Sequence, residues 1–115
     1  MSLYENARPN PAGHRDVSAP EVTLPAKGFR LLDVREPHEF TGELGHIPGA
    51  ELVPMGAVAA HAPGWNKDEE ILVICKSGGR SANIAQLLTR AGFSRVMNLT
   101  GGMLGWNAAG LPVEK

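Results

Sequence analysis

The sequence has 115 residues, a formal net charge of -1, 43% hydrophobic residues and 20% charged residues, a composition that fits one globular domain with an ordinary core. This nearly balanced charge leaves no basic face for nucleic acid. No apolar run comes near the roughly 20 residues of a membrane-spanning helix, so neither nucleic acid nor a membrane is an expected partner. The single cysteine excludes an internal disulfide and favours a reducing compartment, so we expect a cytoplasmic protein.

The N-terminal part of the chain is polar and contains Pro9 and Pro11, which predicts a flexible segment over residues 1–15 before a domain that spans residues 16–115. Between residues 18 and 30, Pro20 and Pro25 leave room for only a turn of helix. Short apolar runs predict strands, and the run at 71–74 is continuous, as in a strand that is buried on both faces. The predicted strands cover residues 16–18, 30–34, 50–53, 71–74 and 95–99.

Helical periodicity is clearest over residues 81–91, with Ser81 as the expected N-cap and Gly92 just beyond the end. A short helix is expected after Pro54, and another over residues 103–109. The order of strand, helix and strand over residues 71–99 requires a crossover between parallel strands. The predicted class is therefore α/β, with helices on both faces of a mostly parallel sheet.

The residues that carry chemistry lie in one loop, between the buried strand and the helix. Cys75 begins this loop, and the remaining candidates for anion binding follow it directly. Glycines allow the positive φ that turns backbone N–H groups inward, and the helix that follows adds its positive end. The candidate residues are Cys75, Lys76, Ser77, Gly78, Gly79, Arg80 and Ser81.

Such a loop is suited to a negatively charged sulfur. A free cysteine has a pKa of about 8.5, so only about 7% is thiolate near pH 7.4. Lowering the pKa by about two units requires about 2.7 kcal/mol of preferential stabilisation of the anion. A helix dipole supplies on the order of 0.5–1 kcal/mol, which is too little alone. Several charge-assisted hydrogen bonds, at about 1.5–3 kcal/mol each, are enough, so we expect the loop backbone to dominate and Lys76 and Arg80 to assist.

Four segments resemble, in the same order, the signature motifs of the rhodanese family. Residues 31–40 resemble the first, residues 45–50 the second, residues 75–81 the active-site loop, and residues 99–113 the C-terminal motif. The resemblance implies a five-stranded parallel sheet sandwiched by helices. It also implies transfer of sulfane sulfur from a donor such as thiosulfate, through a persulfide on Cys75, to cyanide or a thiol. No metal and no organic cofactor are expected.

Two other functions compete with this one. A sulfur-relay or protein-binding module of the same family would take sulfur from a partner protein instead of turning over small molecules. A phosphatase or arsenate reductase is the minor alternative. The similar cell-cycle phosphatases have five residues between the cysteine and the arginine, whereas only four separate Cys75 from Arg80 here. The shorter loop favours sulfur over a phosphate ester.

Five further residues are candidates for supporting the site. Asp33 and Arg35 lie at the end of a predicted strand on the same edge as Cys75, and we expect them chiefly to tie loops together by ion pairs and hydrogen bonds. His46 is expected to orient the turn that follows it, with a hydrogen bond toward Asp33. Gly101 and Gly102 are expected to allow a close turn near the loop.

Overall fold

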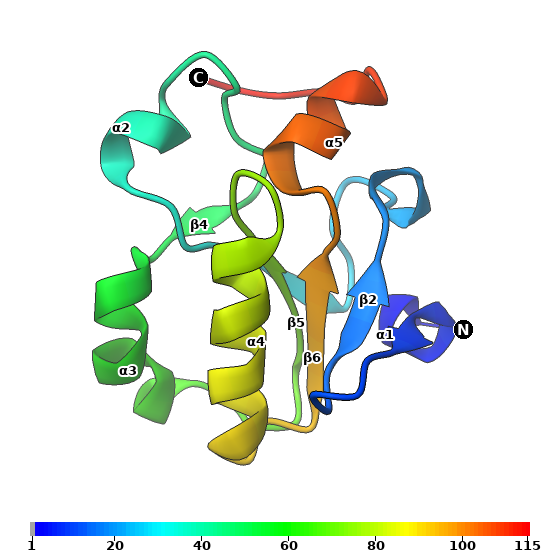
Figure 1. The fold of residues 1–115 in the computed structure, drawn as a ribbon, viewed down its shortest axis with the longest axis vertical. Coiled ribbons are helices and arrows are strands. Elements are labelled where there is room, and N and C mark those ends of the chain that lie inside the picture. The colour runs from blue at the N-terminus through cyan, green and yellow to red at the C-terminus, as the bar shows by residue number, and fades with distance from the viewer. Residues whose placement is uncertain (1) are drawn as a thin grey trace.

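The computed structural model describes residues 2–115, and its strands form one sheet with helices around it (Figure 1). The helices are α1 (Leu3–Asn6), α2 (Pro37–Phe40), α3 (Val58–His61), α4 (Gly79–Arg90) and α5 (Gly102–Ala108), with single turns of 3-10 helix η1 (Ala19–Glu21), η2 (Met55–Ala57) and η3 (Ala62–Gly64). The strands are β1 (Arg8–Pro9), β2 (Arg15–Val17), β3 (Phe29–Asp33), β4 (Glu51–Leu52), β5 (Glu70–Ile74) and β6 (Arg95–Leu99).

The sheet has six strands in the order β1-β2-β6-β5-β3-β4, whereas we expected five. The neighbouring strands β2, β6, β5, β3 and β4 are all parallel to one another. Strand β5 lies between β6 and β3. The additional strand is β1, two residues that pair antiparallel with β2 at the edge. Pro9 has no N–H to donate to a strand on both sides, so an edge position suits it.

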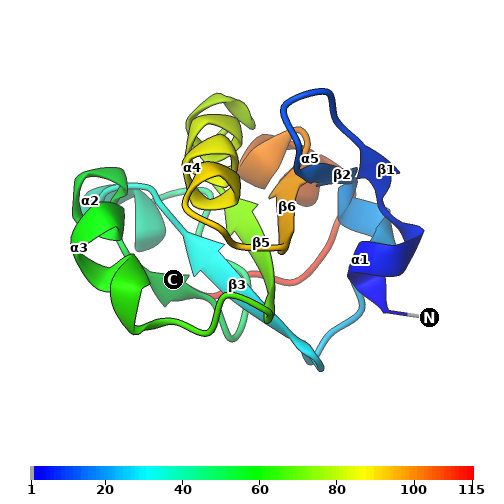
Figure 2. The ribbon, with the colours of Figure 1, turned by 90° about the horizontal axis from the view of Figure 1, so that it is seen from below.

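Two layers of apolar side chains cover the two faces of the sheet, which gives the expected three-layer α/β/α arrangement. The first layer joins alternate residues of β3, β5 and β6 to α3 and α4. The second joins the intervening strand residues to α5 and η1 and includes Ala7. Figure 2 shows α4 and α1 on opposite sides of the sheet. All five residues of β5 are buried, which is why its sequence is continuously apolar from Ile71 to Ile74.

The N-terminal segment departs from the expectation of a flexible tail, because α1 and β1 both form and pack on the domain. The backbone N–H of Tyr4 donates to the Glu70 carboxylate at 3.0 Å, and Ala7 is buried. The domain boundary at residue 16 stays a prediction. The segment between Ser18 and Arg30 holds one turn of 3-10 helix, η1, as its prolines predicted. Within residues 2–115, no helix is both long and apolar enough to cross a membrane.

Candidate active site

The candidate loop lies at the edge of the sheet where the parallel strands end. Cys75 follows β5 directly, and α4 begins four residues later, at Gly79. Figure 1 shows this loop beside the start of α5. The N-cap of α4 is Gly78, in a left-handed conformation, so the prediction of Ser81 as N-cap was wrong. Ser81 instead lies inside the first turn and is fully buried, because its side chain turns back toward Cys75.

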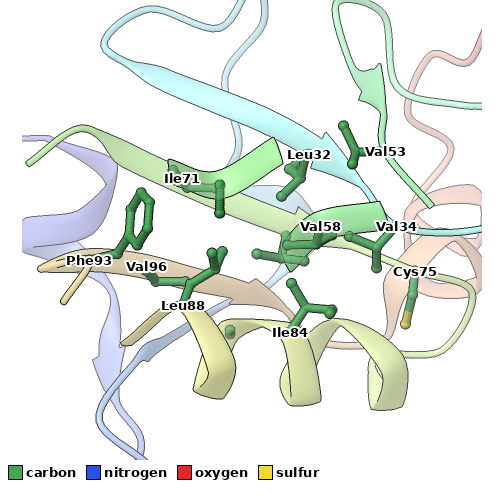
Figure 3. Close-up of a cluster of buried hydrophobic side chains, with 13 residues drawn as sticks. Leu32, Val34, Val53, Val58, Ile71, Cys75, Ile84, Leu88, Phe93 and Val96 are labelled. Atoms are coloured by element: carbon green, nitrogen blue, oxygen red, sulfur yellow. The ribbon is translucent and has the colours of Figure 1, made fainter. Parts of the chain in front are cut away.

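The sulfur of Cys75 is surrounded by hydrogen-bond donors. The Gly78 N–H lies 3.0 Å from Sγ, and the Ser81 hydroxyl lies 3.2 Å from it. Burial raises the pKa of the Cys75 thiol, but hydrogen bonds from the Ser81 side chain and from the backbone of Ser81, Gly78 and Ser77 outweigh it, so that the pKa is lowered from its ordinary value. The residue is only 1% exposed, and Figure 3 shows its sulfur at the end of the core cluster, beside the N-terminal end of α4.

The two glycines of the loop have different roles. Gly78 has a φ of +108°, and a Cβ there would lie 3.3 Å from the backbone nitrogen of Gly101. Gly79 is the first residue of α4, has no positive φ, and has open space where a Cβ would lie. Only Gly78 therefore provides the left-handed turn that we expected from both glycines.

The start of α5 fixes the other side of the loop. The N–H of Met103 donates to the Cys75 carbonyl at 2.9 Å, and the N–H of Leu104 donates to the Lys76 carbonyl at 3.0 Å. Gly101 and Gly102 precede these donors with φ values of +78° and +54°. A Cβ on Gly102 would lie only 2.5 Å from the Cys75 carbonyl oxygen. The pair of glycines thus allows α5 to approach the loop at backbone contact distance.

The two basic residues of the loop differ in their surroundings, because Arg80 is paired with a carboxylate and Lys76 is exposed. Arg80 donates to both carboxylate oxygens of Glu39, on α2, at 2.7 and 2.8 Å. This hydrogen bonding from Arg80 lowers the pKa of Glu39 to about 2, so the Arg80 charge is balanced by a carboxylate at neutral pH. Lys76 is exposed at the rim of the loop. We expected Arg80 to assist the loop with its charge, and that role stays a prediction; the pairing with Glu39 offsets the charge, and sequence spacing could not reveal Glu39 as its partner.

Asp33 and Arg35 form a buried ion pair behind the site. The Arg35 guanidinium donates to both carboxylate oxygens of Asp33 and to the carbonyl oxygens of Gly45 and Glu39. These bonds connect the end of β3 to α2, through Glu39, and to the turn that follows α2, through Gly45.

His46 bonds differently from the prediction. Its Nδ1 lies 2.8 Å from the carbonyl oxygen of Phe40 instead of near Asp33, and its ring stacks on the Phe40 ring. Its backbone pairs with Glu114 through two hydrogen bonds. His46 therefore joins the C-terminal segment to the turn after α2.

Asn98, on β6, is a residue that we did not single out from the sequence. The residue is 5% exposed, its Oδ1 accepts a hydrogen bond from Ser81 Oγ, and its Nδ2 lies 3.4 Å from the Gly78 carbonyl oxygen. The signal available was an asparagine among the apolar residues of a predicted inner strand. Buried amides need hydrogen-bond partners, so such a residue points toward a polar neighbour.

The site offers a nucleophile and an anion cradle but no cluster of metal ligands. Within residues 2–115, no three His, Cys, Asp or Glu side chains are placed to share a metal ion. A small cavity of about 230 Å³ lies next to the loop and is lined in part by Arg35, Glu39, Glu43 and Lys76. The arrangement suits attack by a cysteine thiolate on a small anionic reagent.

Comparison with known proteins identifies relatives of this chain. The sequence is 32% identical over 101 residues to the thiosulfate sulfurtransferase GlpE of Vibrio cholerae, covering 88% of this chain and 93% of that protein. It is 38% identical over 97 residues to a Bacillus subtilis protein named "Putative sulfur carrier protein YrkF", covering 77% of this chain but only 51% of that one. The chain thus spans about half the length of this relative.

A solved structure gives the same result. The crystal structure of a rhodanese-related protein from Thermoplasma volcanium matches with a TM-score of 0.77 and 28% identity, covering 86% of this chain and 96% of that one. The Rhodanese-like domain family model matches residues 18–109, which include the loop, Ser81 and Asn98. With the motifs, the sheet and the loop all in agreement, the chain belongs to the rhodanese-like domain family.

Proposed function

We propose that this protein is a sulfurtransferase that carries sulfane sulfur as a persulfide on Cys75, with thiosulfate as a donor and a thiol or cyanide as acceptor. The observation that carries the proposal is the set of donors around Sγ, with Gly78 N–H at 3.0 Å and the Ser81 hydroxyl at 3.2 Å. These donors favour a thiolate, which is the nucleophilic form of cysteine. Relatives named as sulfurtransferases support the same chemistry.

The reaction has two displacements. In the first, the Cys75 thiolate attacks the outer sulfur of thiosulfate; a bond forms between the two sulfurs, the sulfur–sulfur bond of thiosulfate breaks, and sulfite leaves with the electron pair. In the second, the acceptor attacks the outer sulfur of the persulfide and Cys75 leaves as thiolate. No proton has to be removed from a preformed thiolate, so the mechanism needs no general base. The same loop amides stabilise Cys75 as nucleophile and as leaving group.

A sulfur relay between proteins is a second candidate for this same cysteine. The resemblance to YrkF, whose name describes a sulfur carrier, favours it. In this case a persulfidated partner protein would load Cys75, and thiosulfate would not. The chain has no second cysteine to resolve an adduct, so an external acceptor must remove the sulfur in either case. We place the reaction in a reducing compartment, the cytoplasm, because the single cysteine cannot form an internal disulfide.

Phosphoryl transfer fits the loop less well. An arginine that binds a phosphate oxyanion must present its guanidinium to the ligand. The Arg80 guanidinium is already bound to Glu39 by two hydrogen bonds at 2.7 and 2.8 Å. With only four residues between Cys75 and Arg80, the loop also has one residue fewer than the phosphatases of this scaffold.

The direct test is to incubate the protein with thiosulfate and measure its intact mass. The proposal predicts a gain of one sulfur atom and release of sulfite, both absent in Cys75→Ser. Subsequent addition of cyanide should restore the original mass and produce thiocyanate. Loading by a persulfidated protein without loading by thiosulfate would assign the relay function instead. A protein that takes up sulfur from neither source is not a sulfurtransferase.

A further inference from the structure

The Ser81 hydroxyl faces two acceptors in a buried place. Cys75 Sγ lies 3.2 Å from Ser81 Oγ, and Asn98 Oδ1 also accepts a hydrogen bond from this oxygen. A hydroxyl has one proton to donate, so it cannot serve both acceptors together. Ser81 is fully buried and Asn98 is 5% exposed, so bulk water does not readily replace the missing donor. The two acceptors therefore compete for one proton.

The orientation of the Asn98 amide decides which of its atoms faces Ser81. Its Nδ2 lies 3.4 Å from the carbonyl oxygen of Gly78. Rotating the amide by half a turn would place Oδ1 against this carbonyl, with two acceptors facing each other and no proton between them. The Gly78 carbonyl thus favours the orientation in which Oδ1 points at Ser81.

We propose that Asn98 is a positioning residue that withdraws the Ser81 proton from Cys75 Sγ and so favours the sulfur-loaded cysteine over the empty thiolate. Only the effect on sulfur loading rests on the proposed function. The competition for the Ser81 proton involves residues of this chain alone.

The thiol, thiolate and persulfide states of Cys75 differ in whether Sγ needs a hydrogen bond from the Ser81 hydroxyl. A neutral thiol donates its own S–H to Ser81 Oγ, and the hydroxyl remains with Asn98. The thiolate has no proton, so the hydroxyl must turn to Sγ, which leaves Asn98 Oδ1 buried without a donor. In the persulfide the charge lies on the outer sulfur and Sγ is a neutral bridging atom, so the hydroxyl returns to Asn98. Asn98 thus disfavours the thiolate alone.

The charged groups around Cys75 do not change with this residue. Lys76 and Arg80 come from its own loop, and Arg80 is paired with Glu39 of α2. Asp33, the last residue of β3, interacts with the Arg80 charge and is itself paired with Arg35. The first turn of α5, which packs against the loop, has no charged side chain. Replacement of Asn98 by a neutral residue leaves every one of these charges in place.

The test uses the rate of alkylation of Cys75 by iodoacetamide as a function of pH. Asn98→Leu, close to asparagine in size, and Asn98→Ala both remove Oδ1. Each should increase the acid dissociation constant of the thiol by about 3- to 10-fold, as expected for one released hydrogen bond.

The matched control is the same substitution in a Ser81→Ala background. Without the hydroxyl there is no proton to release, so Asn98→Leu should leave the alkylation profile of Ser81→Ala unchanged. A structural role for Asn98 would disturb the loop in both backgrounds. If either Asn98→Leu or Asn98→Ala folds and raises the pKa, or if the shift persists without Ser81, the inference is wrong.

The second readout is the loading equilibrium, measured as the persulfide fraction by intact mass at fixed thiosulfate and sulfite, at a pH where the thiol is ionised. Asn98→Leu should decrease the ratio of persulfide to thiolate by the same 3- to 10-fold factor. An unchanged or larger ratio would overturn the loading half of the proposal. If the wild-type protein takes up no sulfur, the proposed function fails, and the alkylation profiles still decide the role of Asn98.

Discussion

Replacement of Gly102, the first residue of α5, by alanine should disturb the active-site loop more than replacement of either glycine of the loop, Gly78 or Gly79. A Cβ at this position would lie 2.5 Å from the Cys75 carbonyl oxygen and 2.6 Å from the carbonyl carbon and oxygen of Lys76. All three are backbone atoms, so no flexible side chain can move aside. Either α5 or the loop must shift.

The cost has two parts. Gly102 has a φ of +54°, and a non-glycine residue in this left-handed region costs about 1–2 kcal/mol. The shift also strains the hydrogen bonds from Met103 and Leu104 to the loop carbonyls, at 2.9 and 3.0 Å, and each is worth about 0.5–1.5 kcal/mol. Loss of both bonds together with the backbone strain gives a destabilisation of about 2–5 kcal/mol.

Equilibrium unfolding in urea measures this cost, and Gly79→Ala is its matched control. Gly79 is also a loop glycine, but it has open space for a Cβ and no positive φ. Gly79→Ala should therefore be neutral or add about 0.4–1 kcal/mol, because alanine restricts the unfolded chain. If Gly102→Ala unfolds at the same urea concentration as the wild type, the close approach of α5 to the loop is not what holds it in place.

Two further predictions concern charged pairs near the site. Asp33→Ala leaves the Arg35 guanidinium, which is 1% exposed, without its anion, and should lower the free energy of unfolding by about 3–5 kcal/mol in urea; a loss under 1 kcal/mol would show that the carbonyl acceptors suffice. The folded-state pKa of Glu39 is about 2, below its ordinary value of 4.5, so the stability contributed by its pair with Arg80 is full above pH 4.5 and lost as the pH falls toward 2. Glu39→Gln should remove this part of the acid dependence of unfolding, and an acid dependence identical to that of the wild type would contradict the assignment.

The strands and the long helix could be predicted from local patterns, because burial imposes them residue by residue. The strand over Arg95–Leu99 was predicted with the bounds that the structure gives it, and β5 differs only by the addition of Glu70. The start of α4 was misplaced by two residues, because Ser81 is a favourable N-cap by type whereas Gly78 is the cap by conformation. β1 was missed since two residues carry no periodicity.

Within the site, the sequence identified the loop but not the side chains that reach it from elsewhere. Cys75, Gly78 and Ser81 are close in sequence, so their convergence follows from one turn and the start of one helix. Glu39 and Asn98 lie 41 and 17 residues from their partners Arg80 and Ser81. Their positions depend on how α2 and β6 are placed against the loop, and a single sequence does not specify those distances.

Direct titration of the Cys75 thiol by its thiolate absorbance in the ultraviolet tests the central claim. The chain has one cysteine, so the signal that is lost in Cys75→Ser belongs to this residue alone. The loop donors lower the pKa, so the thiolate should form below the pH range of a free cysteine, and alkylation should rise through the same pH interval and then level off. A midpoint at or above the free-cysteine pKa of about 8.5 would contradict the account.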